Sequence, residues 1–494
     1  MPTPFTRRLT IGLVGVLIAA LTSGINDRVT DIALADLLGS FGLGHDEGSW
    51  ITSVYSAAEV SAMLVAAWFA ITFSLRRFAI SATLVFGVLG ILMPFATNFE
   101  SLVALRILQG LAGGALPPLL MTAALRFLPW HVKLYGLSAY ALTATFGPNI
   151  STPLASLWTE GYDWRMVFWQ IVPTCFLAAG LIAYGLPQDP LRLERFKQID
   201  WRGMLLGVGG LSMLIVAVTQ GERLDWLNSP LICLLLLGAA VCLPLFLINE
   251  WYHPLPLFKL QLLSRRNFAF GLTTLCLYLF LAMAGSAIPS SYLGEVQGYR
   301  ALQSMPVSLI IAAPQLLVAP LVAFVLNRNW VDSRYVMAGG LLLLTTACLG
   351  GSLITSEWIR ENFYVLQIMH TFGQPMIVVP LLMNATGVIA PMEGPFASSM
   401  INTMRGLFTV LASAALENFI THREHFHSNV LIDGLANRGA ALVDPPAASR
   451  LTEQAFVLSY SDAYLSLLSV VVVLSIVLVT LPKRAFPPQP PVSP

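Results

Sequence analysis

The sequence consists of long apolar runs separated by short charged or Pro/Gly-rich segments. Of its 494 residues, 56% are hydrophobic and 11% are charged, whereas a soluble domain carries about 25% charged residues. A membrane-spanning helix needs ~20 apolar residues, so fourteen spans use ~280 positions, close to the apolar total. The pattern therefore predicts an all-α integral membrane protein embedded in a lipid bilayer.

Fourteen transmembrane helices are expected, in the order six plus two plus six. They fall near residues 9–36, 49–73, 78–97, 101–123, 134–157, 166–186, 203–219, 230–248, 268–293, 304–326, 335–355, 363–386, 398–420 and 463–481. We expect an N-terminal six-helix bundle (1–199), two linker helices (200–266) and a C-terminal six-helix bundle (267–494), the last with a long outside loop at 422–462. Two matching halves are typical of repeat-built transporters.

The loop cations predict the orientation, because Lys and Arg accumulate on the cytoplasmic side of a membrane. With the N-terminus inside, the inside loops hold seventeen Lys and Arg residues and the short outside loops hold four. We therefore expect both termini in the cytoplasm. The net charge of +1 gives no case for a nucleic-acid partner. The five cysteines are scattered through apolar runs, and we expect no disulfide, metal or cofactor.

Three cations and several acids fall inside the predicted spans, where each costs a few kcal/mol unless it is paired or faces water. The candidates among them are Asp27, Arg28, Asp31, Glu59, Arg106, Arg405 and Glu417. Asp27 and Asp31 are four residues apart and share a helix face, although Asp27 with Arg28 can equally end the first helix at the interface. Glu59 has no basic residue within one turn, so a buried partner or a proton must neutralise it. Glu417 is expected at the outer surface.

One face of the fourth span carries polar residues first and small residues further along the helix. The residues on this face are Arg106, Gln109, Gly110, Gly113 and Gly114. Small residues let a neighbouring helix approach closely, while a buried arginine needs an acid or carbonyl groups opposite. Further polar candidates for a substrate cavity are Asn149, His370, Gln374 and Asn384, and we add Gln109 and Arg405 to them. A cavity of mixed polar and apolar lining suits varied ligands.

The 422–462 segment contains three histidines within six residues, His422, His425 and His427. No fourth ligand is evident, so we favour an exposed loop over a zinc site. Apolar residues at Phe426, Val430, Leu431 and Leu435 suit a short amphipathic helix on the membrane surface or against a partner. A plain solvated loop is the alternative.

Together these residues resemble the major facilitator superfamily, specifically its fourteen-helix drug:proton antiporter branch of the EmrB/QacA type. Residues 106–110, Arg-Ile-Leu-Gln-Gly, resemble the fourth-helix motif, whose arginine is implicated in proton transfer, and Gly147-Pro148 resembles the fifth-helix antiporter motif. The first helix departs from the family pattern, since Asn26 precedes Asp31 where an aspartate usually precedes an asparagine. The coupling acid therefore cannot be carried across from the family directly.

The resemblance implies a major facilitator fold and a proton-coupled multidrug exporter of the bacterial inner (plasma) membrane. Such a protein exports small amphipathic or aromatic compounds by alternating access and confers antibiotic resistance. The long outside segment resembles that of EmrB-like members, which protrudes toward a periplasmic adaptor protein, so we expect a tripartite pump with an outer-membrane channel. An exporter dedicated to one metabolite, such as a siderophore, is the alternative.

Proton coupling is expected at a carboxyl group on the first two helices. Glu59 and Asp31 are the leading candidates, Arg106 is the expected counter-ion, and Asp27 is expected to stay ionised beside Arg28. No nucleophile–base pair or set of metal ligands stands at membrane depth, which argues against an intramembrane enzyme. No loop is long enough for the soluble output domain of a sensor.

Overall fold

The computed structural model describes residues 5–328, 330–437 and 445–481, and none of these residues lies in a strand. The first helices are α1 (Arg7–Ile32), α2 (Leu34–Phe41), α3 (His45–Phe73), α4 (Leu75–Leu92), α5 (Phe99–Gly114), α6 (Leu116–Phe127), α7 (Trp130–Gly161), α8 (Met166–Trp169) and α9 (Ile171–Gly185). They are followed by α10 (Trp201–Gln220), α11 (Pro230–Tyr252), α12 (Arg266–Glu295), α13 (Ala301–Leu326), α14 (Ser333–Gly351), α15 (Tyr364–Thr386), α16 (Gly394–Asn437) and α17 (Pro445–Thr480). The prediction of an all-α fold is confirmed.

Twelve helical segments within the described residues are long and apolar enough to cross a membrane. This confirms the prediction of a multi-pass membrane protein. The two further ranges predicted to span, 134–157 and 398–420, lie on α7 and α16. Both helices carry many polar residues, such as Ser398, Ser399 and Asn402 of α16. The count of fourteen crossings stays a prediction, as do the boundaries of the two halves.

The polypeptide starts α5 with a capping residue and ends it before a pair of prolines. The Asn98 side chain accepts a hydrogen bond from the Ser101 backbone N–H at 2.9 Å, which satisfies one of the free donors at the helix start. Pro117 and Pro118 lack an N–H, so the α5 hydrogen-bond pattern cannot continue through them. These two signals fix the register that places Arg106 two turns into α5.

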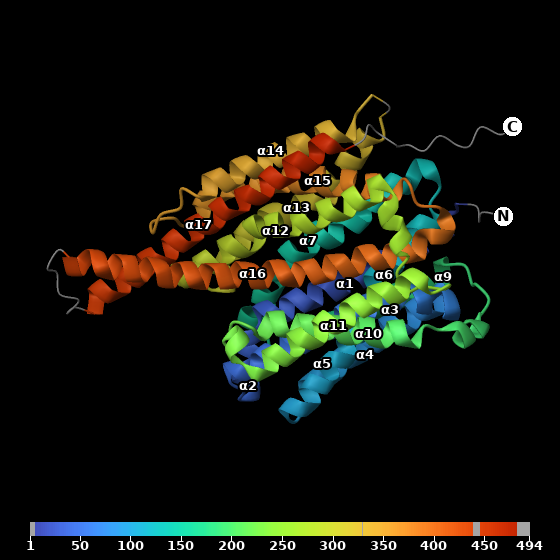
Figure 1. Ribbon diagram of the computed structural model, residues 1–494, viewed down its shortest axis with the longest axis horizontal. Helices are drawn as coiled ribbons and strands as arrows, with labels where there is room; N and C mark the ends of the chain where they lie inside the picture. The colour runs from blue at the N-terminus through green and yellow to red at the C-terminus, as the bar shows by residue number, and fades with distance from the viewer. Residues whose placement is uncertain (1–4, 329, 438–444, 482–494) are drawn as a thin grey trace.

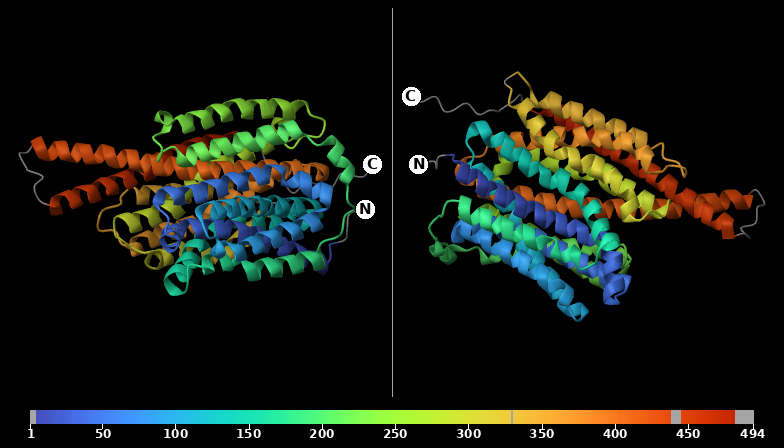
Figure 2. Two further views of the ribbon diagram at one scale, coloured as in Figure 1. Left: turned by 90° about the horizontal axis from the view of Figure 1, so that it is seen from below. Right: turned by 180° about the vertical axis from the view of Figure 1, so that it is seen from behind.

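Two groups of helices lie side by side in Figure 1. We call α1 to α9 the N-terminal half and α12 to α17 the C-terminal half. The halves meet along two seams, because α7 packs against α13 and α3 packs against α16. The linker helices α10 and α11 form a separate layer at one side, drawn in green in Figure 2, and α10 contacts both α3 and α16. The linker therefore covers the α3–α16 seam.

Helix α1 begins and α17 ends at the same end of the bundle, which we call the termini end (Figure 1). At the opposite end α16 and α17 project together beyond the other helices. We call residues 422–437 and 445–462 of these two helices the hairpin, and this end the hairpin end. Two termini at one end are what an even number of membrane crossings requires.

The hairpin corrects our expectation of a long loop at 422–462. Helix α16 continues to Asn437 and α17 starts at Pro445, so most of this segment is regular helix. The two helices hold each other, since Arg423 Nε donates to Asp462 Oδ2 at 2.7 Å and His427 Nε2 lies 2.7 Å from the same oxygen. Pairing between residues 35 or more positions apart stabilises the helices, and local sequence does not report such pairing.

The two halves are bonded to each other near the termini end. Ser398 Oγ of α16 donates to the Pro118 carbonyl oxygen of α6 at 2.6 Å, and Tyr140 OH of α7 donates to Asn402 Oδ1 of α16 at 2.8 Å. Ser399 Oγ donates to the Met63 carbonyl oxygen of α3 at 3.1 Å. These bonds close the space between the halves on this side.

A cluster of charged residues secures the α15–α16 connection at the same end. Glu393 lies within 2.6 Å of both Lys259 Nζ and Arg265 Nη1. Burial alone raises the pKa of Glu393, but the hydrogen bonds from Arg265 and Lys259 outweigh it and hold the pKa at about 2. The cluster therefore stays ionised at neutral pH and ties the start of α16 to the start of α12.

Candidate functional site

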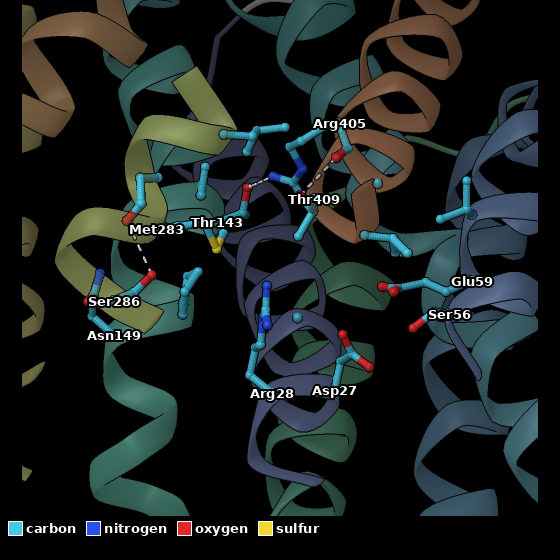
Figure 3. Close-up of a pocket in the computed structure, with 18 of the residues that line it drawn as sticks. Asp27, Arg28, Ser56, Glu59, Thr143, Asn149, Met283, Ser286, Arg405 and Thr409 are labelled. Atoms are coloured by element: carbon cyan, nitrogen blue, oxygen red, sulfur yellow. Dashed lines mark hydrogen bonds between the residues drawn. The ribbon is translucent and has the colours of Figure 1, made fainter. Parts of the chain in front are cut away.

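A central cavity of about 110 Å³ lies between the two halves and is lined by both. Figure 3 shows Asp27, Arg28, Glu59 and Arg405 around one space. The first two side chains come from α1, Glu59 comes from α3 and Arg405 comes from α16. Met283 of α12 supplies apolar lining. Four ionisable groups of balanced charge thus meet in the middle of a membrane-spanning bundle.

Among the residues that the structure describes, none lies close enough to these four charged groups to form an ion pair, that is, with a nitrogen–oxygen distance of 4 Å or less. Arg405 instead donates a hydrogen bond to the Thr143 hydroxyl and lies 5.5 Å above the Tyr140 ring. Both partners belong to α7, so Arg405 bridges the two halves. Charged groups at this depth that are not paired directly mark a cavity that serves binding or ion movement.

A second cavity, of about 390 Å³, adjoins the first toward the hairpin end. We call it the outer cavity. The two cavities share Asp27, Arg28, Ser56, Thr409 and Val410. Asp31, His45 and Glu417 also line the outer cavity, and the side chains of His45 and Glu417 are exposed. The outer cavity therefore connects the central cavity with the surface.

Arg106 is completely buried and lines neither cavity. One nitrogen of its guanidinium group, Nη1, donates to Gln109 Oε1 at 2.9 Å, and the group lies 4.0 Å from the centre of the Tyr55 ring. Within the part of the chain that the structure describes, its Nε and Nη2 have no hydrogen-bond partner. In this conformation the arginine is thus held by an amide and an aromatic ring, and no acid pairs with it directly.

The small residues of α5 press against the backbone of α3 beside Tyr55 and Glu59. A Cβ atom built on Gly114 would lie 2.1 Å from the Glu59 carbonyl oxygen, and one on Gly110 would lie 2.6 Å from the Tyr55 carbonyl oxygen. This is the close helix approach that the glycine pattern predicts. It fixes the depth at which Glu59 enters the central cavity.

Gly114→Ala is expected to destabilise the protein by about 1–3 kcal/mol, the usual cost of overpacking. The added methyl group meets backbone rather than a movable side chain, so α3 and α5 must separate. Gly180→Ala on α9 is the matched control, because a Cβ there meets nothing within 4 Å. Thermal unfolding of the detergent-solubilised protein measures both variants. Equal midpoints for Gly114→Ala and the parent would contradict the packing argument.

The structure brings together some of the sequence-based site residues and leaves others apart. Asp27, Glu59, Asn149, Gln374 and Arg405 line the central cavity, and Asp31 lines the outer cavity. Arg106, Gln109, His370 and Asn384 are buried elsewhere in the bundle. The sequence interpretation missed the uncharged lining residues Ser56, Thr143, Ser286 and Thr409, because hydroxyl side chains are frequent in membrane helices and carry no distinguishing signal alone.

The family model of the Major Facilitator Superfamily matches residues 16–413. The chain belongs to the Major Facilitator Superfamily. It is therefore a multi-pass membrane transporter and not an enzyme. The predicted resemblance to this superfamily is confirmed.

Two relatives of this transporter place it near the EmrB type. It is 25% identical over 424 residues to the probable multidrug resistance protein EmrY of Escherichia coli (strain K12), covering 85% of this chain and 81% of EmrY. It is 22% identical over 440 residues to the multidrug export protein EmrB of the same strain, covering 87% of this chain and 83% of EmrB.

A solved structure supports the fold of this transporter. The human organic anion transporter MFSD10 (TETRAN) aligns with a TM-score of 0.56 at 14% sequence identity, covering 95% of this chain and 100% of that one. The similarity concerns the arrangement of the helices.

Proposed function

We propose that this transporter is a proton-coupled exporter of small amphipathic or aromatic compounds that works by alternating access in a bacterial inner membrane. The observation that carries the proposal is the central cavity, in which Asp27 and Glu59 face Arg28 and Arg405 between the two halves. The names of EmrY and EmrB support export of more than one compound. The bias of basic residues toward the loops at the termini end supports cytoplasmic termini.

The carboxyl groups of α1 and α3 offer a route for protons from the surface to the central cavity. Asp31 lines the outer cavity, Asp27 lines both cavities and Glu59 lines the central cavity. Antiport needs a group that holds a proton when substrate is absent and releases it when substrate binds. A carboxyl group close to movable arginines meets this need, since the positive charge favours its ionised form.

The conformation suits the exit stage of an export cycle. Bonds between the halves close the termini end, while the outer cavity leads toward the hairpin end. In the opposite stage these bonds must break, so that substrate can enter from the cytoplasm. A ligand that binds one stage more tightly than the other shifts the population toward it.

The lining of the central cavity suits amphipathic compounds. Val60, Leu279 and Met283 provide apolar surface, while Asn149 and Gln374 provide amide groups. A flexible methionine adapts its shape to different ligands. The proposed substrates are therefore compounds with an aromatic or apolar body and a few polar groups.

Uptake into inverted membrane vesicles tests this proposal. An imposed proton gradient is expected to drive accumulation of several members of a panel of dyes, weak acids and siderophores. Accumulation of a single siderophore would favour the dedicated exporter. If the gradient drives accumulation of no compound in the panel, antiport is wrong.

We further propose that the hairpin docks onto a periplasmic adaptor protein, so that the transporter is the inner-membrane part of a tripartite pump. Phe426 and Val430 are each about half exposed on a helix that projects from the bundle (Figure 2). Exposed apolar side chains on a projecting helix mark a contact surface for another protein.

A shortened hairpin is expected to separate transport from resistance. Replacing residues 430–449 by a short Gly/Ser linker keeps the Arg423, His427 and Asp462 cluster at the base, so the helix pair stays closed. We expect normal uptake in vesicles and at least about a tenfold loss of resistance in cells, because substrate no longer passes to the adaptor. A second variant removes only the exposed apolar side chains, as Phe426→Ser with Val430→Ser, and it is expected to lose resistance in cells as well. Full resistance of cells with the shortened hairpin would contradict adaptor docking.

A further inference from the structure

We propose that the end of linker helix α10 forms a wall of the outer cavity, and that Thr219 on this wall contributes to substrate selection. The inference rests on the proposed function, in which the outer cavity is the exit route. Thr219 is a lining residue of that cavity, although α10 lies outside both six-helix halves. The other lining residues come from α1, α2, α3 and α16.

The end of α10 is fixed to the N-terminal half by polar contacts to α3. The buried Gln220 donates through Nε2 to Ser53 Oγ at 2.7 Å and accepts at Oε1 from Ser49 Oγ at 3.3 Å. Just beyond the helix, Arg223 Nη1 lies 3.2 Å from Asp46 Oδ1. Ser49 and Ser53 line the outer cavity themselves, so these contacts hold α10 at its edge.

The same part of the linker is also fixed to the C-terminal half. Asn418 Nδ2 of α16 donates to Glu222 Oε2 at 2.8 Å, and Trp226 Nε1 donates to the same oxygen at 2.9 Å. Asn418 directly follows Glu417, which lines the outer cavity. The residues around Thr219 therefore bridge α3 and α16, two of the helices that line the outer cavity.

The position of Thr219 favours selection by size and shape. Its hydroxyl donates to the Ile215 carbonyl oxygen of its own helix at 2.9 Å, so it does not need a substrate as partner. A larger side chain at this position narrows the outer cavity while the contacts of Gln220 and Glu222 keep α10 in place. The KM for transport of a bulky substrate then rises more than the KM for a small one.

Transport of two dyes through the full-length protein tests the selection. Thr219→Trp is expected to raise the KM ratio of rhodamine 6G to the smaller ethidium at least fivefold, whereas Thr219→Ser leaves the ratio unchanged. Leu237→Trp is the matched control, because Leu237 is 64% exposed on α11 and lines neither cavity. An unchanged ratio in Thr219→Trp overturns the inference.

Labelling separates failure of the inference from failure of the proposed function. A membrane-impermeant maleimide, added to intact cells, is expected to label Thr219→Cys but not Leu237→Cys. The background carries Cys233→Ser, because Cys233 is exposed. If Thr219→Cys is labelled but the parent transports neither dye, α10 is still a wall of the outer cavity, and the result counts against the export proposal. Absence of labelling at Thr219→Cys overturns the inference whether or not the dyes are transported.

Discussion

Glu59→Gln is expected to lower proton-driven accumulation in inverted vesicles at least about tenfold, because an amide cannot carry the proton that the cycle needs. The side chain keeps its size and its polarity, so substrate still binds in the central cavity. Binding is then expected to lose its dependence on pH, since no proton has to leave Glu59 when substrate enters. Uptake along an imposed proton gradient, and substrate binding at pH 6 and pH 8, measure the two effects.

The controls for this prediction separate the cavity acids from surface acids. Glu361→Gln removes an exposed carboxylate that pairs with Arg360 at the protein surface, and it is expected to leave transport unchanged. Asp31→Asn tests the outer end of the proposed proton route. Unchanged proton-driven transport in both Glu59→Gln and Asp31→Asn would remove this route and direct attention to Asp27 and Glu417.

The sequence predicted the helices well because membrane insertion is a local property. Every backbone polar group in a bilayer must be satisfied within its own helix, and a run of apolar residues therefore reports a helix directly. Each of the fourteen predicted ranges overlaps a helix of the structure, although residues 96–97 and 352–355 lie beyond the helix ends. The breaks between α1 and α2 at Ala33 and between α5 and α6 at Ala115 were not predicted, because the apolar runs continue through both positions.

The sequence predicted only part of the hairpin, because the stability of its two helices comes from their pairing. The apolar residues Phe426, Val430, Leu431 and Leu435 suited a short helix, but nothing local indicated that α16 continues to Asn437 or that α17 starts at Pro445. Asp462 joins Arg423 and His427 across the two helices. A polar helix outside the membrane is stabilised mainly by such tertiary contacts.

The charged residues of the candidate site could be predicted from the sequence, but the residues that they contact could not. A charged residue inside an apolar run is visible in one sequence, and Asp27, Glu59 and Arg405 were chosen in this way. The contact of Arg405 with Thr143 joins residues 262 positions apart, and no spacing rule connects them. His370 was chosen for its polarity, but it is buried against Gly285 of α12 rather than in the cavity.

Replacement of Arg106 by leucine is expected to abolish transport while leaving the fold as stable as before or more so. A buried charge without an ion pair costs several kcal/mol of desolvation. The contact with the Tyr55 ring offsets up to about 2 kcal/mol of this desolvation cost. The hydrogen bond with Gln109 offsets about 1.5–3 kcal/mol more. The sum leaves little net stabilisation from Arg106. Arg106 therefore contributes more to the electrostatics of the site than to stability, and a cation beside the acids of α1 and α3 can drive proton release when the halves move.

Arg106→Lys separates the charge from the shape of the guanidinium group. Lysine keeps the positive charge but loses the planar contact with Tyr55 and the fixed donor geometry toward Gln109, so we expect partial transport. Arg106→Leu is expected to show no proton-driven uptake in vesicles and an unfolding midpoint equal to or above that of the parent in detergent. Proton-driven uptake by Arg106→Leu at the parental rate would exclude Arg106 from the coupling mechanism. A large drop in its unfolding midpoint would instead show that Arg106 is a structural residue, with a stabilising partner that the present conformation does not contain.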